Sequence, residues 1–508
     1  MSGLEASKHL TRRRALRLLG MGAGVTLLAA CGQSAQPAPT AAPPPSSGQA
    51  KPAEPAKPAE AAKPAESKPA APAAAPAATT DPAKPAEAAK PAEAAKPAAQ
   101  AAPAKTGGTV ALRFFFWTGS EEESKFWQEM AADASKMVGN VEVKFETDSF
   151  NNYWTKLPAD AASGTIADIL GLQSLRTGGF ASRNLYLPLD DLIKDDKSFD
   201  LADFDKTIVD GLSYKGKLYA LSYDFGPNVI FLNKALFQKA GVALPKPDWT
   251  WNDFLETSKG LSKKIDGNDV FGIVGSNQFN PMVPWIFSNG GDYANADFTK
   301  SALSSPETLE AIQFYADLLQ KHKVAAPITD PGNPNADRDQ FQGTRAAMYV
   351  SGPWQFINMR SRMKDDWDIV PLPKGKAGSV SWVAGSGFGV STSTKYPKEA
   401  WEVVKALTST EGLKKVAASG RGYPGRKSAV EAFYKKDALP EHQEMIGEQL
   451  KTAKPFRTNP TWQEIDTQLR SSLVDPIMLE GKPVAEVVKA AEPGYQSLID
   501  RGAQQAGR

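Results

Sequence analysis

The chain has 508 residues, of which 41% are hydrophobic and 23% charged, and its formal net charge is +2. This near balance of acids and bases excludes a strongly basic nucleic-acid-binding protein. Cys31 is the single cysteine, so no internal disulfide is available and the folded part must be stabilised by a buried core.

The N-terminal segment carries two export features. Basic residues up to Arg17 precede an apolar core over residues 18–30, which is shorter than the roughly 20 apolar residues that a spanning helix requires. Thr11-Arg12-Arg13-Arg14 resembles a twin-arginine export signal, and Leu28-Ala29-Ala30-Cys31 resembles a bacterial lipobox. We expect residues 1–30 to be a signal peptide, with general secretory export as the alternative route. Cys31 is then lipidated and holds the protein at the outer face of the cytoplasmic membrane; the alternative is an ordinary buried thiol.

Residues 31–106 consist almost entirely of Ala, Pro, Lys and Glu, which predicts a disordered linker. Proline removes helix hydrogen bonds, and no large apolar side chain is present to offset the entropy of ordering. Eight lysines and six acids leave a charge of only +2, too weak and too mixed for a nucleic-acid tail. Residues 1–30 carry +4, so the part after residue 106 carries −4 and is expected to meet the membrane only through the lipid.

After residue 106, short apolar runs alternate with segments of helical periodicity. This alternation predicts an α/β fold with mostly parallel sheets flanked by helices, whose ligands bind beyond the carboxyl ends of the strands. The predicted strands are residues 109–117, 141–145, 166–172, 229–232, 271–274, 346–350, 367–371 and 387–391. The predicted helices are residues 121–137, 153–162, 251–262, 306–322, 398–407, 411–418, 462–479 and 484–499. Lys215-Gly216 is a predicted hairpin turn.

Several segments in this part share a family pattern. They are Tyr214-Lys215-Gly216-Lys217-Leu218-Tyr219-Ala220, Asn228-Val229-Ile230-Phe231-Leu232-Asn233-Lys234, Lys246-Pro247-Asp248-Trp249-Thr250-Trp251, Ala346-Ala347-Met348-Tyr349-Val350-Ser351-Gly352-Pro353-Trp354, Pro371-Leu372-Pro373-Lys374-Gly375 and Gly387-Phe388-Gly389-Val390-Ser391. In this order, the segments resemble the extracellular solute-binding proteins of the maltose-binding type, which deliver carbohydrates to ABC importers. The resemblance covers residues 107 to about 499.

The resemblance implies a two-lobed periplasmic-binding-protein fold of type II, with hinge crossings near Gly226 and Gly385. Residues 107–225 and about 386–430 are expected to form the first lobe, and residues 226–385 and about 431–508 the second. A monomer without a cofactor or metal is expected, with a sugar or oligosaccharide ligand and an ABC permease as partners. The lobes close around the ligand because only the closed form contacts it from both sides.

Sugar recognition requires aromatic rings for the apolar face of the ligand and polar groups for its hydroxyls. Trp117 and Trp285 lie beside polar loops, although packing alone also explains Trp285. The family pattern places ring-stacking aromatics at Trp354 and Trp462 and a cleft-lining turn at Asn289. The remaining candidate ligand-binding residues are Thr118, Glu121, Gln173, Tyr223, Asp224, Ser386, Gly387, Arg421 and Tyr423. For Thr118 and Glu121, helix capping is the alternative role, and for Asp224 and Arg421 it is an ordinary solvated charge.

Two other function classes remain open at this stage. A secreted carbohydrate-active enzyme would require a pair of acids at a defined separation, which the sequence does not specify. Only His322 and His442 follow the linker, so zinc motifs of the His-Glu-x-x-His or cysteine-rich kind are absent from the sequence. A glycerophosphodiester, polyamine or peptide is the alternative ligand, and each would require convergent charges in the cleft.

Overall fold

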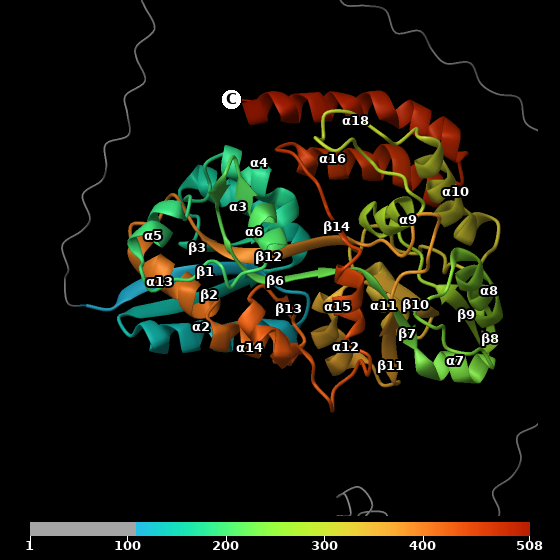
Figure 1. Cartoon of the computed structure of the whole chain (residues 1–508), viewed down its shortest axis with the longest axis horizontal. Helices are drawn as coiled ribbons and strands as arrows, with labels where there is room; N and C mark the ends of the chain where they lie inside the picture. Colours follow the sequence, from blue (N-terminus) through green and yellow to red (C-terminus); the bar gives the residue numbers. More distant parts are fainter. Residues whose placement is uncertain (1–107, 508) are drawn as a thin grey trace, which may run out of the picture. The chain divides into compact units, whose positions relative to one another are not determined.

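The computed structural model describes residues 108–507 (Figure 1). The predicted signal peptide, Cys31 and the linker up to residue 106 lie outside the described residues. None of the described helices is both long and apolar enough to cross a membrane.

The first sheet has seven strands in the order β13-β6-β12-β3-β1-β2, with β14 paired to β12. Helices α3, α4 and α6 cover one face, and α2, α13 and α14 cover the other (Figure 1). We call this sheet and its helices the first lobe. Its strands are β1 (Val110–Trp117), β2 (Val141–Asp148), β3 (Ile169–Gln173), β6 (Leu221–Pro227), β12 (Trp382–Val390), β13 (Tyr423–Pro424) and β14 (Lys454–Pro455). Its helices are α2 (Glu121–Val138), α3 (Phe150–Ser163), α4 (Thr177–Ser182), α5 (Asp190–Asp195), α6 (Lys206–Gly211), α13 (Pro397–Leu407) and α14 (Thr410–Ser419).

The second sheet has five strands in the order β11-β7-β10-β9-β8 and, with its helices, forms the second lobe. Its strands are β7 (Val229–Asn233), β8 (Lys263–Ile265), β9 (Asn268–Ile273), β10 (Ala346–Ser351) and β11 (Trp367–Val370). Its helices are α7 (Lys234–Ala240), α8 (Trp251–Leu261), α9 (Val283–Ser288), α10 (Pro306–Gln320), α11 (Ala336–Gln342), α12 (Phe356–Arg362), α15 (Met445–Leu450), α16 (Trp462–Leu469), α17 (Asp475–Met478) and α18 (Val484–Gly507). Helix α18 packs on α10 and α16 at one end of this lobe (Figure 1).

The α/β fold is confirmed, but both sheets are mixed rather than mostly parallel. Strand β1 is parallel to β2 and β3, whereas β12 is antiparallel to both β3 and β6. In the second sheet, β10 is parallel to β9 and antiparallel to β7. The antiparallel pairs arise because strands entering from the other lobe run back along their neighbours, a constraint that local periodicity does not reveal.

The chain passes between the two sheets at two places. It leaves the first sheet at Pro227 and enters the second at Val229, close to the predicted crossing at Gly226. The crossing predicted near Gly385 is wrong: Gly385 lies inside β12, and the chain crosses between Val370 and Trp382. After β14 the chain leaves the first sheet again and continues into helix α16. A methyl group on Gly226 would lie 2.5 Å from Cγ of Pro353, so glycine permits close approach of the lobes at the first crossing.

Local sequence signals explain the ends of the elements near the cleft. The Ser120 side chain caps α2 by accepting the Glu123 N–H, and three glutamates lie in the first turn, where the helix dipole favours negative charge. The predicted turn at Lys215-Gly216 connects the short strands β4 (Ser213–Tyr214) and β5 (Lys217–Leu218), with positive φ at both residues. The helix predicted over residues 462–479 is divided into α16 and α17 by a π-helical segment, Arg470–Val474.

Candidate functional site

A cleft of about 250 Å³ lies where the two lobes meet. The first lobe contributes the ends of β1, β3 and β6 and the start of α2, and the second contributes α11, β10 and the segment before α12. Strand β12, which follows a crossing, forms part of the floor. A larger hollow of about 740 Å³ is lined by α4, α6, residues 455–460 and the end of α18. The smaller cleft is the candidate site because it gathers aromatic rings and buried polar groups from both lobes.

Trp354 forms the main aromatic surface of the cleft. Its ring stacks on Trp382, with centroids 5.9 Å apart and planes 20° from parallel. Trp382 is fixed in turn because its Nε1–H donates to the Asn280 carbonyl oxygen at 3.0 Å. Trp117 is only 6% exposed and packs among other rings, including Phe116, so it contributes less open surface than Trp354.

A buried charge cluster underlies the cleft. Arg421 pairs with Glu123 through its Nε, and its Nη1 lies 3.1 Å from Oδ2 of Asp224. Its Nη2 donates to the Tyr223 hydroxyl at 2.9 Å, and the Ser386 N–H donates to Asp224 Oδ1 at 3.0 Å. Burial raises the pKa of Asp224 to about 7, against the opposing charge of Arg421. All three guanidinium nitrogens of Arg421 are thus occupied within the protein, so this residue positions the floor of the cleft.

Four buried polar atoms along the cleft have no hydrogen-bond partner among the described residues. They are Asn228 Nδ2, Asn280 Oδ1, Asn358 Oδ1 and Arg338 Nε. Burying such groups unpaired costs about 1–3 kcal/mol each, so hydrogen bonds from a ligand would recover this cost. The atoms have almost no solvent-exposed surface in this structure, and a ligand therefore reaches them only when the side chains or the lobes move. Asn228 Nδ2 and Arg338 Nε are hydrogen-bond donors, whereas Asn280 Oδ1 and Asn358 Oδ1 are acceptors. The set therefore matches a ligand whose groups both donate and accept.

Arg338 connects the lobes across the cleft. Its Nη1 donates to the Gly119 carbonyl oxygen at 3.4 Å, and the Gly119 N–H donates to Glu123 Oε2 at 2.8 Å. The neighbouring Asp337 is also buried, and burial raises its pKa to about 6. The second lobe thus reaches the start of α2 beside the buried charge cluster.

Seven of the predicted ligand-binding residues come together in this cleft. They are Trp117, Gln173, Tyr223, Asp224, Trp354, Ser386 and Arg421. Gln173 accepts a hydrogen bond from Arg176, and Asp224 and Arg421 are buried rather than solvated. Their direct contact with a ligand stays a prediction.

The other seven predicted residues lie outside the cleft. Trp285 and Trp462 are each 1% exposed and pack in the core of the second lobe, and Asn289 donates to Glu310 on α10. Thr118 hydrogen-bonds with Thr147, and Glu121 pairs with exposed Lys125. Gly387 packs against the Leu221 backbone. Tyr423 lines a separate hollow beside Phe225. Trp285 and Trp462 share the sequence environment of Trp354, but tertiary packing covers them.

Sequence reasoning missed several residues that line the cleft: Glu123, Asn228, Gln278, Asn280, Asn335, Asp337, Arg338, Tyr349, Gln355, Asn358 and Trp382. Asn228 carried a usable signal, because it follows Gly226-Pro227 at the predicted crossing. Arg338 had no sequence signal for a place in the cleft, since the segment around it has an ordinary polar helical composition.

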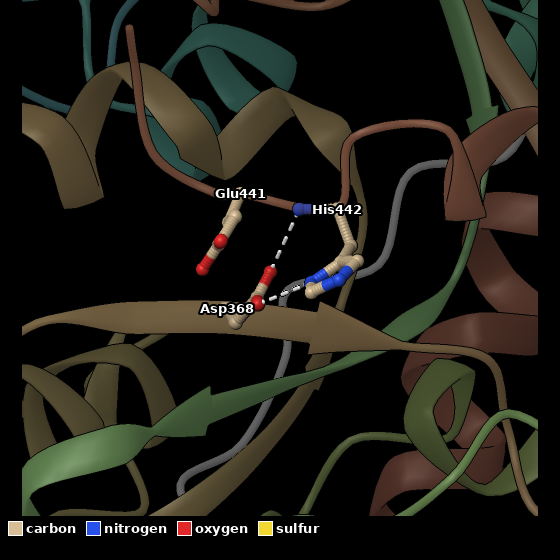
Figure 2. Close-up of side chains that lie close together, drawn as sticks. All are labelled: Asp368, Glu441 and His442. Atoms are coloured by element: carbon tan, nitrogen blue, oxygen red, sulfur yellow. Dashed lines mark hydrogen bonds and ion pairs between the residues drawn. The ribbon is translucent and has the colours of Figure 1, made fainter. Parts of the chain in front are cut away.

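Asp368, Glu441 and His442 form a cluster away from the cleft (Figure 2). Asp368 Oδ2 lies 2.6 Å from Nδ1 of His442, and Asp368 Oδ1 accepts the His442 backbone N–H at 3.0 Å. Glu441 is paired instead with Lys234, at 3.1 Å. Asp368 and His442 thus form a hydrogen-bonded ion pair, which attaches the segment before α15 to β11. It raises the pKa of His442 above 6.5.

Comparisons with known proteins agree with the fold described above. Residues 118–414 match the family model described as bacterial extracellular solute-binding protein. A binding protein of Brucella abortus is 24% identical over 308 residues, which cover 58% of this chain and 71% of that protein. The ABC substrate-binding protein Lmo0181 of Listeria monocytogenes, solved with cycloalternan, superposes with a TM-score of 0.71 at 24% identity, covering 77% of this chain and 98% of that one. The glycerophosphocholine complex of a Mycobacterium tuberculosis protein gives a TM-score of 0.66 at 20% identity, covering 78% and 99%. This chain belongs to the bacterial extracellular solute-binding protein family.

Proposed function

We propose that this protein captures a neutral sugar or polyol in the cleft and delivers it to the permease of an ABC importer. The observation that carries the proposal is the set of buried, unpartnered polar atoms beside the partly exposed ring of Trp354. Sugar hydroxyls both donate and accept hydrogen bonds, whereas the C–H face of the ring packs on an aromatic surface. The Listeria relative in complex with cycloalternan supports the same ligand class.

Closure of the lobes is the proposed mechanism of capture. Asn228 lies at the first crossing, whereas Asn358 and Trp354 belong to the second lobe and Glu123 and Gln173 to the first. A ligand bonded to both lobes stabilises only the closed arrangement, so it shifts the population toward closure. The permease then distinguishes loaded from empty protein by the relative position of the lobes.

The glycerophosphodiester alternative has support from the glycerophosphocholine complex among the similar structures. The cleft chemistry favours a neutral ligand instead. The phosphodiester group only accepts hydrogen bonds at neutral pH, so the glycerol hydroxyls alone can donate to Asn280 Oδ1 and Asn358 Oδ1. Both arginines that line the cleft are already paired with carboxylates, which leaves the negative charge of the phosphodiester without an ion pair. A polyamine only donates, which leaves Asn228 Nδ2 unpaired.

Binding without chemical conversion is also part of the proposal. A glycosidase requires one acid that is free to donate a proton and a second that acts as base or nucleophile. Glu123 and Asp224 both lie in the cleft floor, where Arg421 holds each of them in an ion pair. Neither carboxylate is available to a substrate in this arrangement.

We further propose that Cys31 carries a lipid that holds the protein outside the cytoplasmic membrane. The lipobox-like Leu28-Ala29-Ala30-Cys31 sequence and the membership of an extracellular family support this location. The linker of residues 31–106 then lets the binding domain move around its anchor, which keeps it at high local concentration near the importer.

A calorimetric screen of the full chain tests the proposed function. The panel contains neutral sugars and polyols, a glycerophosphodiester and a polyamine, and mass spectrometry follows each ligand during incubation. We expect saturable binding of a neutral sugar or polyol that is recovered unchanged. Binding of the charged ligands alone, or turnover of the sugar, would contradict the proposal.

A further inference from the structure

The space in the cleft points to a small ligand. We propose that the ligand is a single unphosphorylated sugar ring, or an open-chain polyol of the same size, rather than an oligosaccharide. This inference rests on the proposed function and adds the size and charge of the ligand. Three independent features carry it: the cavity volume, the number of open aromatic surfaces and the pairing of every arginine in the cleft.

The cavity volume sets the first limit. A cavity of about 150 Å³ accommodates benzene, which has six heavy atoms, so each heavy atom requires about 25 Å³. By this ratio the cleft of about 250 Å³ holds on the order of ten heavy atoms. A hexose or hexitol has twelve, whereas a disaccharide has about twice as many. The lobes must separate before a second ring can enter.

Open aromatic surface sets the second limit. Six aromatic residues line the cleft, but Trp117, Tyr223, Tyr349 and Trp382 are each less than 9% exposed. The guanidinium of Arg176 lies 5.2 Å from the centroid of the Phe150 ring and competes for its face. Trp354 stacks on Trp382 and also packs on Gly352, and it is the partly exposed ring that remains for a ligand. A single stacking surface matches a single ring.

The pairing of cationic groups sets the third limit. Arg421 is neutralised by Glu123 and Asp224, and Arg338 lies between Asp337 and Asp339, with its Nη2 3.4 Å from Asp339. The described residues that line the cleft include no lysine. A sugar phosphate requires an unpaired cation or several directed N–H groups. Arg338 Nε and Asn228 Nδ2 are the unpartnered N–H donors among the described residues that line the cleft, and the buried carboxylates of Glu123, Asp224 and Asp337 line it as well. We therefore expect a sugar phosphate to be rejected.

The contact between the lobes also limits the length of the ligand. Arg338 Nη1 bonds to Gly119, and a methyl group on Gly119 would lie 3.4 Å from that nitrogen. The backbone of the first lobe and the side chain of the second are therefore in direct contact at this edge. A longer saccharide that extends past this edge would break the contact.

Calorimetry on the full chain with ligands of increasing length tests this inference. The panel contains pentoses, hexoses and hexitols, the corresponding hexose 6-phosphates, and di- and trisaccharides. We expect a monosaccharide or polyol to bind at least 100-fold more tightly than its phosphate and than any trisaccharide. Equal or tighter binding of a trisaccharide overturns the size limit, and equal binding of a phosphate overturns the charge limit; both outcomes leave sugar capture intact. Binding by none of the neutral sugars and polyols overturns the proposed function itself.

A pair of variants tests the role of the edge contact. Arg338→Ala removes the side chain that meets Gly119, and we expect the ratio of disaccharide to monosaccharide affinity to rise at least tenfold. Arg362→Ala is the matched control, because Arg362 on α12 also pairs across the lobes, with Glu122 on α2 at 3.8 Å, but does not line the cleft. The control should keep the wild-type ratio. An unchanged ratio in Arg338→Ala, or an equal change in both variants, contradicts the proposed limit at this edge.

Discussion

Replacement of Arg421 by methionine should strongly destabilise the protein. The change removes the guanidinium but leaves Glu123 and Asp224, which are only 4% and 5% exposed. Removing one partner of a buried ion pair costs about 3–5 kcal/mol, because the remaining charge stays buried without compensation. We therefore expect the free energy of unfolding of Arg421→Met to fall by about 3–5 kcal/mol at pH 8, measured by urea denaturation with tryptophan fluorescence.

The pH dependence of this loss follows from the buried acids. Burial already raises the pKa of Asp224 to about 7 in the presence of Arg421, against about 3.9 in an unfolded chain, and loss of the arginine raises it further. Because the pKa of Asp224 is higher in the folded than in the unfolded protein, the folded protein binds more protons than the unfolded chain at pH values between the two. The stability of the variant therefore falls as the pH rises through this range. The deficit should be clearly smaller at pH 4.5 than at pH 8.

Two control variants separate this effect from general damage. Arg113→Met removes an ion pair with Glu146 whose side chains are 39% and 27% exposed, so it should cost about 1 kcal/mol or less. A triple variant, Arg421→Met with Glu123→Gln and Asp224→Asn, removes all three charges and should recover most of the lost stability. A deficit below 1 kcal/mol in Arg421→Met, or one that is equal at both pH values, would refute the assignment of a buried charge cluster.

Three further predictions follow from the site, the ion pair in Figure 2 and the N-terminal sequence. Trp354→Ala should weaken sugar binding at least tenfold, about 1.4 kcal/mol, as measured by calorimetry. Trp285→Ala, in the core, should instead lower the free energy of unfolding by about 3–5 kcal/mol, as measured by urea denaturation. An unchanged sugar affinity of Trp354→Ala removes this residue from the site. Asp368 raises the pKa of His442 above 6.5 in the folded protein. The ion pair between them therefore stabilises the protein fully below pH 6.5, and this stabilisation is lost as the pH rises through the folded-state pKa of His442. His442→Gln should therefore lose less stability than the wild type between pH 6 and pH 9, and parallel pH profiles would argue against the pairing. Cys31→Ser should move the protein from the membrane fraction to the soluble fraction with its sugar affinity unchanged; continued membrane association would exclude a lipid at Cys31.

Local patterns predicted the elements well where burial and periodicity agree. The strand ending at Trp117 and the helix that follows it occur as expected, because an apolar run meets a capping serine and acidic first-turn residues. The predicted crossing at Gly385 failed for a tertiary reason. The position of β12 depends on its pairing with β3 and β6, which lie about 160 or more residues away in the sequence.

The site was only partly predictable because the same residue type can line the cleft or pack in the core. Trp354 and Trp285 both follow a proline and lie near polar turns, yet Trp285 packs against Trp251 and Phe254 in the core. Arg421 was a candidate ligand contact, but its partners Glu123 and Asp224 lie 298 and 197 residues away. Pairings over such separations decide whether a charged side chain faces a ligand, and they are not visible in local sequence.

The stacked indoles of Trp354 and Trp382 give this protein an optical signal of its own. Trp354 follows β10 in the second lobe, whereas Trp382 begins β12 of the first sheet. Two nearly parallel chromophores at this separation couple electronically, so a change in their spacing alters circular dichroism and fluorescence in the near ultraviolet. The spacing of these two rings in the cleft can therefore be followed in the native chain without an attached dye, with Trp354→Phe as the variant that removes the coupling.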